Sequence, residues 1–291
     1  FEHHILDIRQ DFKDTVITNF IDEYLHGRTP NPCVICNSTI KWGKLIQTAD
    51  KLGCQYIATG HYARIGYEEG QYFLRKGADI SKDQTYFLWT LTQENLARTI
   101  FPLGELTKPE VRKIAFDHGY EKLSKKGESQ EICFIPDNDY RAFLAEHVEN
   151  FHEKYGPGDF VDTNGKRLGS HKGFPNYTIG QRKGLGIALG QPMFVVAIHP
   201  DTNTVVLGTK DELQGKTFYA KNINLMKYKT LPEGLEVTAK IRYRNEGKLA
   251  SLFPEGERIR VVFHESIDSI TPGQSAVFYE NEDVVGGGII E

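Results

Sequence analysis

Residues 37–61 read NSTIKWGKLIQTADKLGCQYIATGH, and this stretch decides the fold class. Its first part predicts a helix that starts at Asn37 or Ser38 and ends at Gly53, because apolar residues recur at helical spacing: Trp42, Leu45, Ile46, Ala49 and Leu52. Residues 56–59 then predict a short buried strand, followed by a glycine turn. A helix, a strand and a glycine turn in this order are typical of a parallel α/β sheet, whose ligands bind at the carboxyl ends of its strands.

The flanking sequence continues this alternation. Apolar residues of 12–25 fall on one helical face, with Asp11 as the predicted N-cap and Gly27 as the stop. Residues 107–119 predict another helix, capped by Thr107 and ended by a glycine. The first part of the chain is therefore predicted to be an α/β domain.

After the segment IPDNDYRAFLAEHVE at 135–149, which predicts a short helix, helical periodicity fades. Residues 156–208 are rich in glycine and carry hairpin signals at DTNGKR and MFVVAIHPDTNTVVLG, which predict a small β-rich middle domain. From about Phe218, several short apolar segments have the spacing of a small closed β-barrel, because closure removes exposed sheet edges. The predicted domains are residues 1–136, 137–214 and 215–291.

The composition is that of an ordinary globular protein, with 39% hydrophobic and 25% charged residues among 291. No apolar run approaches the ~18–20 residues of a membrane span. The opening FEHHILDIRQDF lacks the basic and apolar regions of a signal peptide. We therefore expect a cytoplasmic protein without a membrane role.

The stretch NPCVICN at 31–37 holds two of the four cysteines, which are too few for a disulfide scaffold. Zinc is disfavoured, because Cys54 and Cys133 stand alone without a histidine at pairing distance. A reactive pair is favoured, since Cys36 lies just before the predicted helix start, where the helix dipole lowers the pKa of a thiol. Two unreactive loop cysteines, Cys33 and Cys36, are the remaining alternative.

The other two cysteines differ in their surroundings. Cys133 lies in GESQEICFIPD, which predicts a loop entering a strand with the thiol at a sheet edge that faces a pocket. Cys54 begins the predicted buried strand and is interpreted as a core residue without a function.

A span of the chain from residue 163 to 200 contains no acidic residue and five basic ones. Within it, HKGFPNYTIGQRKGLGIALG combines Lys172, Arg182 and Lys183 with five glycines, which suits contact with a nucleic-acid backbone. A solvated loop is the alternative. KIRYR, at 240–244, is predicted to place its three basic residues on one face of a strand, where they also suit RNA.

Two further sets of polar residues, His61 and the run 82–84, stand next to apolar segments and are candidates for the site. His61 follows the predicted strand at its carboxyl end and is either a ligand contact or a structural histidine. Lys82, Asp83 and Gln84 precede an apolar run and predict a helix N-terminus, with simple capping by Asp83 as the alternative.

Eight segments together resemble the bacterial tRNA-specific 2-thiouridylases, and they follow the order of that family along nearly the whole chain. They are GRTPNPCVICNSTIKW, YIATGHYAR, SKDQTYFLWTL, FPLGELTKPEVRKIA, SQEICFI, TIGQRKGLGI, KIRYR and TPGQSAVFYENEDVVGGGIIE. The resemblance implies a PP-loop ATPase domain of the adenine nucleotide alpha hydrolase-like type, a small tRNA-binding middle domain and a C-terminal β-barrel.

The activity implied by the resemblance is that of a tRNA-uridine 2-sulfurtransferase. ATP, with Mg²⁺, activates C2 of the wobble uridine U34 in the anticodon stem-loop, and sulfur arrives as a cysteine persulfide. A cysteine desulfurase or a relay protein is the implied sulfur donor. A disulfide between the two reacting thiols is an implied intermediate.

The family motifs place the implied roles on numbered residues of this chain. Cys133 is the persulfide carrier, Cys36 is the nucleophile that attacks it, and Gly60 lies against ATP. The target base is bordered by Asn31, Pro32 and Cys33. The expected tRNA contacts, including two from the acid-free span, are His61, Lys82, Asp83, Gln84, Arg182, Lys183, Arg242, Tyr243 and Gln274. No resident metal is expected.

Two departures from the family pattern leave alternatives open. The phosphate-binding loop SGGxDSS is absent, so the domain is interpreted as N-terminally truncated and the isolated 291 residues are expected to be inactive. A non-catalytic tRNA-binding fragment is therefore one alternative. Cys33 stands where some family members carry Asp, so a [4Fe–4S] cluster held by Cys33, Cys36 and Cys133 is another.

Overall fold

A pair of long helices begins the fold. The computed structural model describes residues 2–127, 132–188 and 190–291. The first helix consists of α1 (Arg9–Phe12), a π-helical segment (Lys13–Ile17) and α2 (Thr18–Leu25). It begins earlier than predicted, because Ile8 rather than Asp11 is the N-cap residue. It ends at the predicted Gly27, whose φ of 69° allows the chain to reverse.

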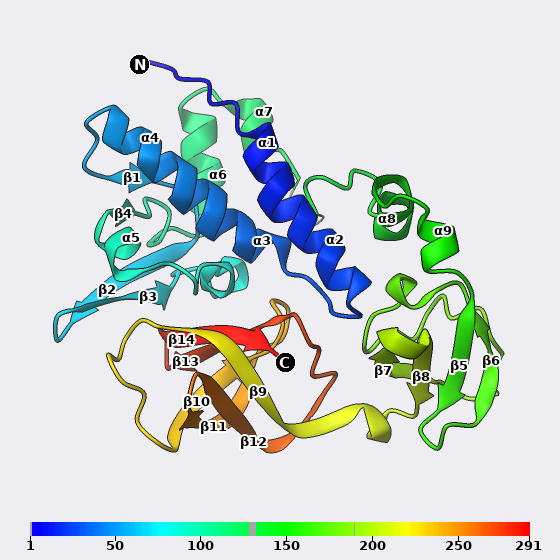
Figure 1. Cartoon of the computed structure of the whole chain (residues 1–291). Helices are drawn as coiled ribbons and strands as arrows, with labels where there is room; N and C mark the ends of the chain where they lie inside the picture. Colours follow the sequence, from blue (N-terminus) through cyan, green and yellow to red (C-terminus); the bar gives the residue numbers. More distant parts are fainter. Residues whose placement is uncertain (1, 128–131, 189) are drawn as a thin grey trace.

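The second helix carries the two cysteines of the NPCVICN stretch. It consists of α3 (Pro32–Ile35), a π-helical segment (Cys36–Lys44) and α4 (Leu45–Lys51). The predicted start at Asn37 or Ser38 is wrong. Asn31 is the N-cap, and Pro32 occupies the first turn, where the missing N–H of proline costs no hydrogen bond. Cys36 therefore lies inside the helix rather than in front of it. The two long helices pack side by side (Figure 1), and Lys44 pairs with Asp11 at 2.6 Å.

A short parallel pair of strands follows, formed by β1 (Ile57–Ala58) and β4 (Thr99–Ile100). This pairing confirms the predicted parallel α/β arrangement. The strand β1 is less buried than predicted, because Ala58 is exposed and Ile57 is only half-buried. Cys54 is also exposed, so its interpretation as a core residue is wrong.

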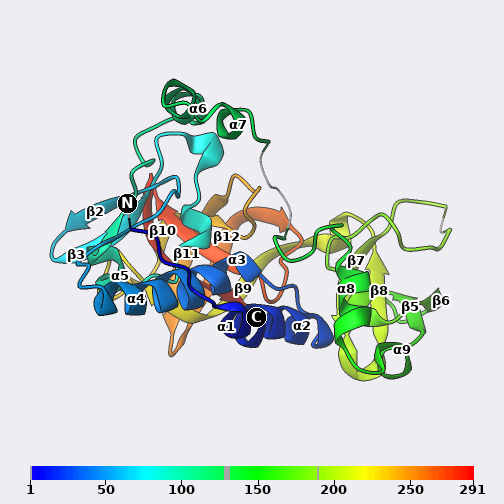
Figure 2. The ribbon, with the colours of Figure 1, turned by 90° about the horizontal axis from the view of Figure 1, so that it is seen from above.

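Three helices complete the first domain: α5 (Gln93–Ala97), α6 (Lys108–Asp117) and α7 (Glu121–Ser124). The predicted helix at 107–119 is α6, which begins with a capping box between Thr107 and Glu110. Helices α6 and α7 stand away from the rest of the domain and bury no residue (Figure 2). The predicted loop residues 128–130 lie outside the described part of the chain.

The C-terminal region is a closed six-stranded barrel, as predicted. Its strands are β9 (Gln214–Leu225), β10 (Leu235–Lys240), β11 (Lys248–Glu255), β12 (Arg258–Asp268), β13 (Ser275–Glu280) and β14 (Asp283–Ile290). They pair in the order β13-β10-β11-β12-β9-β14, and pairing between β13 and β14 closes the ring. The strand predicted for KIRYR ends at Lys240, so the alternation of basic residues along it is wrong.

A hairpin of the first domain extends the barrel sheet. It consists of β2 (Ala63–Glu68) and β3 (Gln71–Lys76), which the sequence reasoning missed. Strand β3 lies beside β14, with Arg75 opposite Asp283. The ion pair between these two residues spans 2.6 Å, and a second ion pair joins Arg64 to Glu282 at 2.8 Å. The first and last parts of the chain therefore share one sheet.

The middle region is a separate four-stranded sheet entered through two short helices. These elements are α8 (Tyr140–His147), α9 (Phe151–Lys154), β5 (Gly158–Asp162), β6 (Arg167–His171), β7 (Phe194–His199) and β8 (Thr204–Gly208). The sheet order β6-β5-β8-β7 contains both predicted hairpins and a parallel pair of β5 with β8. Between β6 and β7, much of the acid-free span runs as an irregular connection.

Among the residues that the structure describes, four groups of buried side chains hold these regions together. One fills the barrel, and another fills the middle sheet. A third joins α2 to the segment 132–155. The fourth is shared, because Trp42 and Trp89 of the first domain pack with Val277 and Tyr279 of the barrel. We call this fourth group the shared core.

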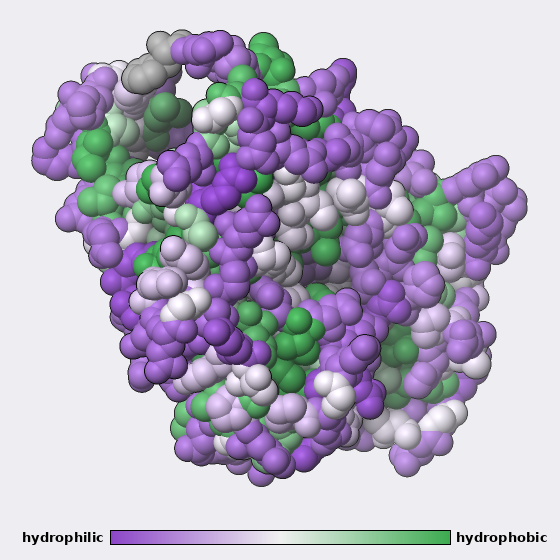
Figure 3. Space-filling view, turned by 60° about the vertical axis from the view of Figure 1, so that its left-hand side comes forward, coloured by the Kyte–Doolittle hydropathy of each residue, from purple (hydrophilic) through white to green (hydrophobic). Residues whose placement is uncertain are grey.

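Several large hydrophobic side chains of the first domain stay exposed. The space-filling view shows hydrophobic patches on the side of the molecule that carries α4 and β1 (Figure 3). The exposed residues of this domain include Leu45, Leu52, Tyr56, Ile100, Ile114, Phe116, Tyr120 and Leu123. No described residue covers these faces. None of the described helices combines the length and the apolar character needed to cross a membrane.

Candidate active site

The start of the second long helix presents two thiols. Cys33 lies in its first turn and is exposed, whereas Cys36, one turn further along, is half-buried. Between them, the buried side chain of Val34 packs into the shared core and fixes the orientation of the helix.

A third thiol arrives from a distant part of the chain. The side chains that follow Cys133 pack against the first long helix: the Phe134 ring lies 5.7 Å from that of Phe12 and 5.3 Å from that of Phe20. Cys133 itself remains exposed. Its thiol helps to raise the pKa of both Cys33 and Cys36, so Cys133 lies in the neighbourhood of the other two thiols.

The expectation of a lowered Cys36 pKa is wrong. Burial raises the pKa of the Cys36 thiol, Lys41 lowers it in part, and Cys133 raises it further. The helix dipole acts mainly on the first turn, and Cys36 lies beyond it. The pKa of the Cys33 thiol is also raised. Although the residue as a whole is exposed, desolvation of the thiol is the largest cause, followed by the thiols of Cys133 and Cys36.

The described residues include no cluster of metal ligands. Within residues 2–127, 132–188 and 190–291, no three side chains of His, Cys, Asp or Glu are placed to hold a metal ion. The alternative of a [4Fe–4S] cluster on Cys33, Cys36 and Cys133 therefore finds no support in the placement of these residues. All four cysteines of the chain are free thiols.

His61 lies beside this helix and is buried, with 8% of its surface exposed. Its Nδ1 is 2.9 Å from the Thr59 hydroxyl, and its Nε2 is 3.2 Å from Nζ of Lys41. The rings of Trp42 and Phe101 contact it. Burial, assisted by the Lys41 charge, lowers the pKa of His61 to about 4. His61 is therefore neutral at physiological pH.

The barrel holds the backbone that leads into the NPC segment. Nε2 of Gln274 donates hydrogen bonds to the carbonyls of Thr29, at 3.1 Å, and Pro30, at 2.8 Å. The Thr29 N–H donates in turn to the Pro272 carbonyl at 2.9 Å. Gln274, expected as a tRNA contact, thus uses its amide inside the protein to position the residues before Asn31.

The segment Lys82–Gln84 connects two 3₁₀ turns, Ile80–Lys82 and Thr85–Phe87, and starts no α-helix. Asp83 is buried, and it accepts hydrogen bonds from the Thr85 hydroxyl at 2.7 Å and the Gly77 N–H at 3.2 Å. The backbone N–H of Gln84 donates to the carbonyl of Tyr62 at 3.0 Å, and its side chain accepts from the Tyr62 N–H at 3.0 Å. Gln84 therefore ties this loop to Tyr62, the residue after His61, whereas Asp83 ties it to Gly77.

Arg242 and Tyr243 lie in the irregular connection after β10. Arg242 is half-buried and donates to the carbonyl of Ser269 at 2.6 Å. Burial lowers the pKa of its guanidinium. The Tyr243 ring lies 4.4 Å from the Phe87 ring. Both residues therefore sit where the barrel meets the first domain.

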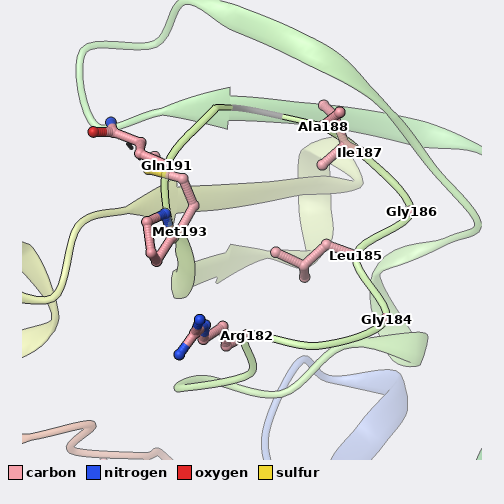
Figure 4. A pocket seen from close by; sticks show the side chains of 9 residues that line it. Arg182, Gly184, Leu185, Gly186, Ile187, Ala188, Gln191 and Met193 are labelled. Atoms are coloured by element: carbon pink, nitrogen blue, oxygen red, sulfur yellow. Dashed lines mark hydrogen bonds between the residues drawn. The ribbon is translucent and has the colours of Figure 1, made fainter.

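Two of the five basic residues of the acid-free span, Arg182 and Lys183, were expected to contact tRNA, and both belong to the middle domain. Arg182 and Lys183 are exposed. Arg182 lies at the edge of an open cavity of about 500 Å³ that is formed by the loop between β6 and β7 (Figure 4). The other lining residues are mostly small or apolar, and they include Leu185, Ile187 and Met193.

Gly60 follows β1 at the carboxyl end of the parallel pair, as predicted. It is exposed, and the nearest atom to the position that a Cβ would take is Cδ1 of Leu103, at 3.6 Å. The backbone at Gly60 is therefore open to a bound molecule, which fits the expected approach of a nucleotide.

Sequence reasoning missed Lys41 and Thr59. Lys41 contacts His61 only because a π-helical segment directs it toward the end of β1, and periodicity along the sequence does not show such a segment. Thr59 carried a weak signal, since it stands two residues before a candidate histidine.

The fold and the site together define a class of protein: an α/β domain of the HUP type, followed by two β-domains and carrying clustered thiols at a helix start. Three family models match the chain in sequence. They are the tRNA methyl transferase HUP domain at residues 1–137, the tRNA methyl transferase PRC-barrel domain at 141–209 and the aminomethyltransferase beta-barrel domain at 215–290.

The similar curated proteins carry a more specific name. The tRNA-specific 2-thiouridylase MnmA of Amoebophilus asiaticus is 53% identical over 292 residues, which cover 100% of this chain and 78% of that protein. The protein of the same name from Salinibacter ruber is 50% identical and is covered to 76%, and that of Moorella thermoacetica is 49% identical and is covered to 81%. The chain belongs to the MnmA family of tRNA-specific 2-thiouridylases, which confirms the resemblance and the fold class drawn from the sequence.

Proposed function

We propose that this chain carries the tRNA 2-thiolation activity for which its relatives are named. The finer proposal is ATP-dependent thiolation of C2 of the wobble uridine U34, with sulfur delivered as a persulfide on Cys133. The observation that supports it is that the Cys133 thiol, which comes from a segment far along the chain, lies near enough to Cys33 and Cys36 to raise the pKa of both.

The thiols have distinct roles in this proposal. The terminal sulfur of the Cys133 persulfide attacks C2 of the uracil and displaces the activated oxygen. The Cys36 thiolate then attacks Sγ of Cys133, the sulfur–sulfur bond breaks, and its electron pair stays on the sulfur bound to C2. The products are 2-thiouridine and a Cys36–Cys133 disulfide, which a cellular dithiol reduces before the next turnover.

The remaining residues bind and position the substrates. When bound, ATP with Mg²⁺ supplies the group that turns the C2 oxygen of uracil into a leaving group. The open backbone at Gly60 faces the nucleotide, and Asn31, Pro32 and Cys33 border the base. Arg182 and Lys183 contact backbone phosphates of the anticodon stem-loop. The persulfide comes from a cysteine desulfurase or a relay protein that docks near the exposed Cys133.

Two other functions are less well supported. Methyl transfer, which is named in two of the matching family models, gives three clustered thiols no task. A non-catalytic tRNA-binding protein equally leaves them without a role. Both alternatives predict that the cysteines are dispensable.

The test measures 2-thiouridine in an unmodified tRNA transcript after incubation with the product of the complete gene, ATP and a persulfide donor. Cys36→Ser and Cys133→Ser should each abolish the product, whereas the matched control Cys54→Ser, at an exposed cysteine, should retain it. Retention of 2-thiouridine in either of the first two variants contradicts the proposal. Mass spectrometry of the tRNA distinguishes thiolation from methylation.

A further inference from the structure

Lys41 lies in the same π-helical segment as Cys36 and is fixed by contacts outside its own helix. Its Nζ is 3.2 Å from Nε2 of His61, which follows β1. An ammonium group only donates hydrogen bonds, so Nε2 of His61 is the acceptor and Nδ1 carries the proton that is donated to the Thr59 hydroxyl. One tautomer of a neutral imidazole satisfies both contacts.

The histidine is held rigidly in this orientation. The Trp42 ring lies 5.5 Å from the imidazole, and the Trp42 Nε1–H donates to the Thr99 hydroxyl at 2.7 Å. The Phe101 ring contacts the imidazole edge-on, with the ring centroids 6.2 Å apart. His61 therefore acts as a fixed, uncharged anchor that directs the Lys41 charge.

The charge is directed toward a thiol. In a π-helix, hydrogen bonds join residues five apart, so Cys36 and Lys41 lie on successive turns of one helix face. Burial is the largest influence on the pKa of the Cys36 thiol, and the titratable groups that act on it are Lys41 from its own helix and Cys133 from the segment at 132–135. Of these two, Lys41 is the one that carries a positive charge.

We propose that Lys41 is a positioning residue of the thiolation site, whose ammonium, anchored by neutral His61, stabilises the Cys36 thiolate. This inference rests on the role of Cys36 in the proposed function. Cys36 lies too far along the helix for the N-terminal dipole to activate it, and Lys41 supplies the missing positive charge. The same charge stabilises the anionic form in which Cys36 attacks the Cys133 sulfur.

The test compares the pH dependence of iodoacetamide labelling at Cys36, resolved by mass spectrometry of its peptide in the full chain. Lys41→Gln keeps an N–H donor for His61 but removes the charge, so the labelling midpoint should rise by about 0.5–1 pH unit. Lys41→Arg keeps the charge and should leave the midpoint within about 0.3 pH units of the wild type. Lys44→Gln is the matched control, because Lys44 pairs with Asp11 instead and should not shift the midpoint.

Two outcomes overturn the inference: an unchanged midpoint in Lys41→Gln, or an equal shift in Lys41→Gln and Lys41→Arg. A thermal unfolding curve for each variant shows whether the fold is retained, and Lys41→Met replaces Lys41→Gln if that protein does not fold. Labelling requires neither tRNA nor ATP. If Lys41→Gln does not raise the labelling midpoint, only the role of Lys41 is contradicted. If thiolation survives Cys36→Ser, the proposed function is contradicted.

Discussion

The two β-domains are attached to the first domain in different ways. The barrel shares a core with it: Trp89 lies so close to β14 that a Cβ on Gly287 would stand 2.7 Å from its ring. The middle sheet instead has a core of its own around Phe160 and Val205, and reaches the first domain through α8, α9 and a contact of Gly27 with Pro200. The barrel therefore shares the core of the domain that holds the site, whereas the middle sheet is attached beside that domain.

The difference separates two kinds of contribution. Barrel residues reach the site through partly buried polar contacts, as Gln274 does with the backbone before Asn31. The middle domain contributes exposed positive charge at Arg182 and Lys183. We therefore expect barrel changes to alter catalysis and middle-domain changes to alter tRNA affinity.

The largest expected effect tests the shared core. Trp89→Ala should lower the free energy of unfolding by about 3–5 kcal/mol, because it leaves a cavity between the first domain and the barrel. Hydrogen exchange should become faster in residues 63–76 and 275–290 together. The matched variant Phe160→Ala should have a similar cost, with faster exchange confined to the middle sheet. If Trp89→Ala leaves the barrel peptides protected, the two domains are not one unit.

The pH dependence of stability is the next test. The first domain, which shares a core with the barrel, buries His61, and the middle sheet buries His171, and the pKa of both histidines is lowered. The pKa of His61 falls from 6.5 to about 4, so the unfolded chain binds the proton first. The stability is complete above pH 6.5, and about 2–4 kcal/mol is lost as the pH falls toward 4. His61→Gln should remove this pH dependence from the first domain and the barrel, and it should leave the middle sheet unchanged.

The second unit serves as the internal control in this experiment. Burial lowers the pKa of His171 in the middle sheet, so that sheet should also lose stability below pH 6.5 in both proteins. Chemical denaturation followed by peptide-resolved exchange at several pH values measures both responses. A His61→Gln protein with unchanged acid sensitivity in residues 2–127 contradicts the assignment.

A smaller effect is expected at the link between the barrel and the NPC segment. Gln274→Ala removes the donors to the Thr29 and Pro30 carbonyls, so kcat for thiolation should fall about tenfold through misplacement of the base-binding residues. The affinity for tRNA should change little. Gln214→Ala, at an exposed glutamine of β9, is the control. A loss of tRNA affinity without a loss of kcat would instead support a direct tRNA contact by Gln274.

The smallest effect concerns the middle domain. Replacing Arg182 and Lys183 by Ala should weaken tRNA binding several-fold and reduce the slope of log affinity against log salt by about 1 for each lost phosphate contact. The kcat at saturating tRNA should stay unchanged. Lys216→Ala, at an exposed lysine of the barrel, should leave the salt slope as it is. If the protein without Arg182 and Lys183 keeps the salt slope of the unchanged protein, this loop does not contact phosphates.

Local signals predicted a large part of this fold. Short-range interactions between neighbouring residues determine three of these features, so the sequence indicates them directly. They are the capping box at Thr107, the helix stop at Gly27 and the two hairpins of the middle sheet. The barrel strands were predictable for the same reason.

Several of the missed features depend on partners that are distant in the sequence. Strand β3 pairs with the neighbouring β2 in a hairpin turned at Gly70, which is a local signal, but its second partner β14 lies far along the chain. The direction of the Cys36 pKa depends on burial by residues that periodicity does not reveal, so the helix dipole was given too much weight. Asp83 and Gln274 were interpreted as surface contacts, and the structure shows their polar atoms used inside the protein.

The sharing of one core by Trp89 and β14 also has a consequence during synthesis on the ribosome. The first domain emerges long before Val284 and Gly287 are translated, so the nascent polypeptide must wait with Trp89 and Leu74 uncovered. The middle sheet, lying between them in the sequence, can close on its own core meanwhile. Chaperones that recognise aromatic segments would therefore meet the beginning of this chain, rather than its centre, for most of its translation.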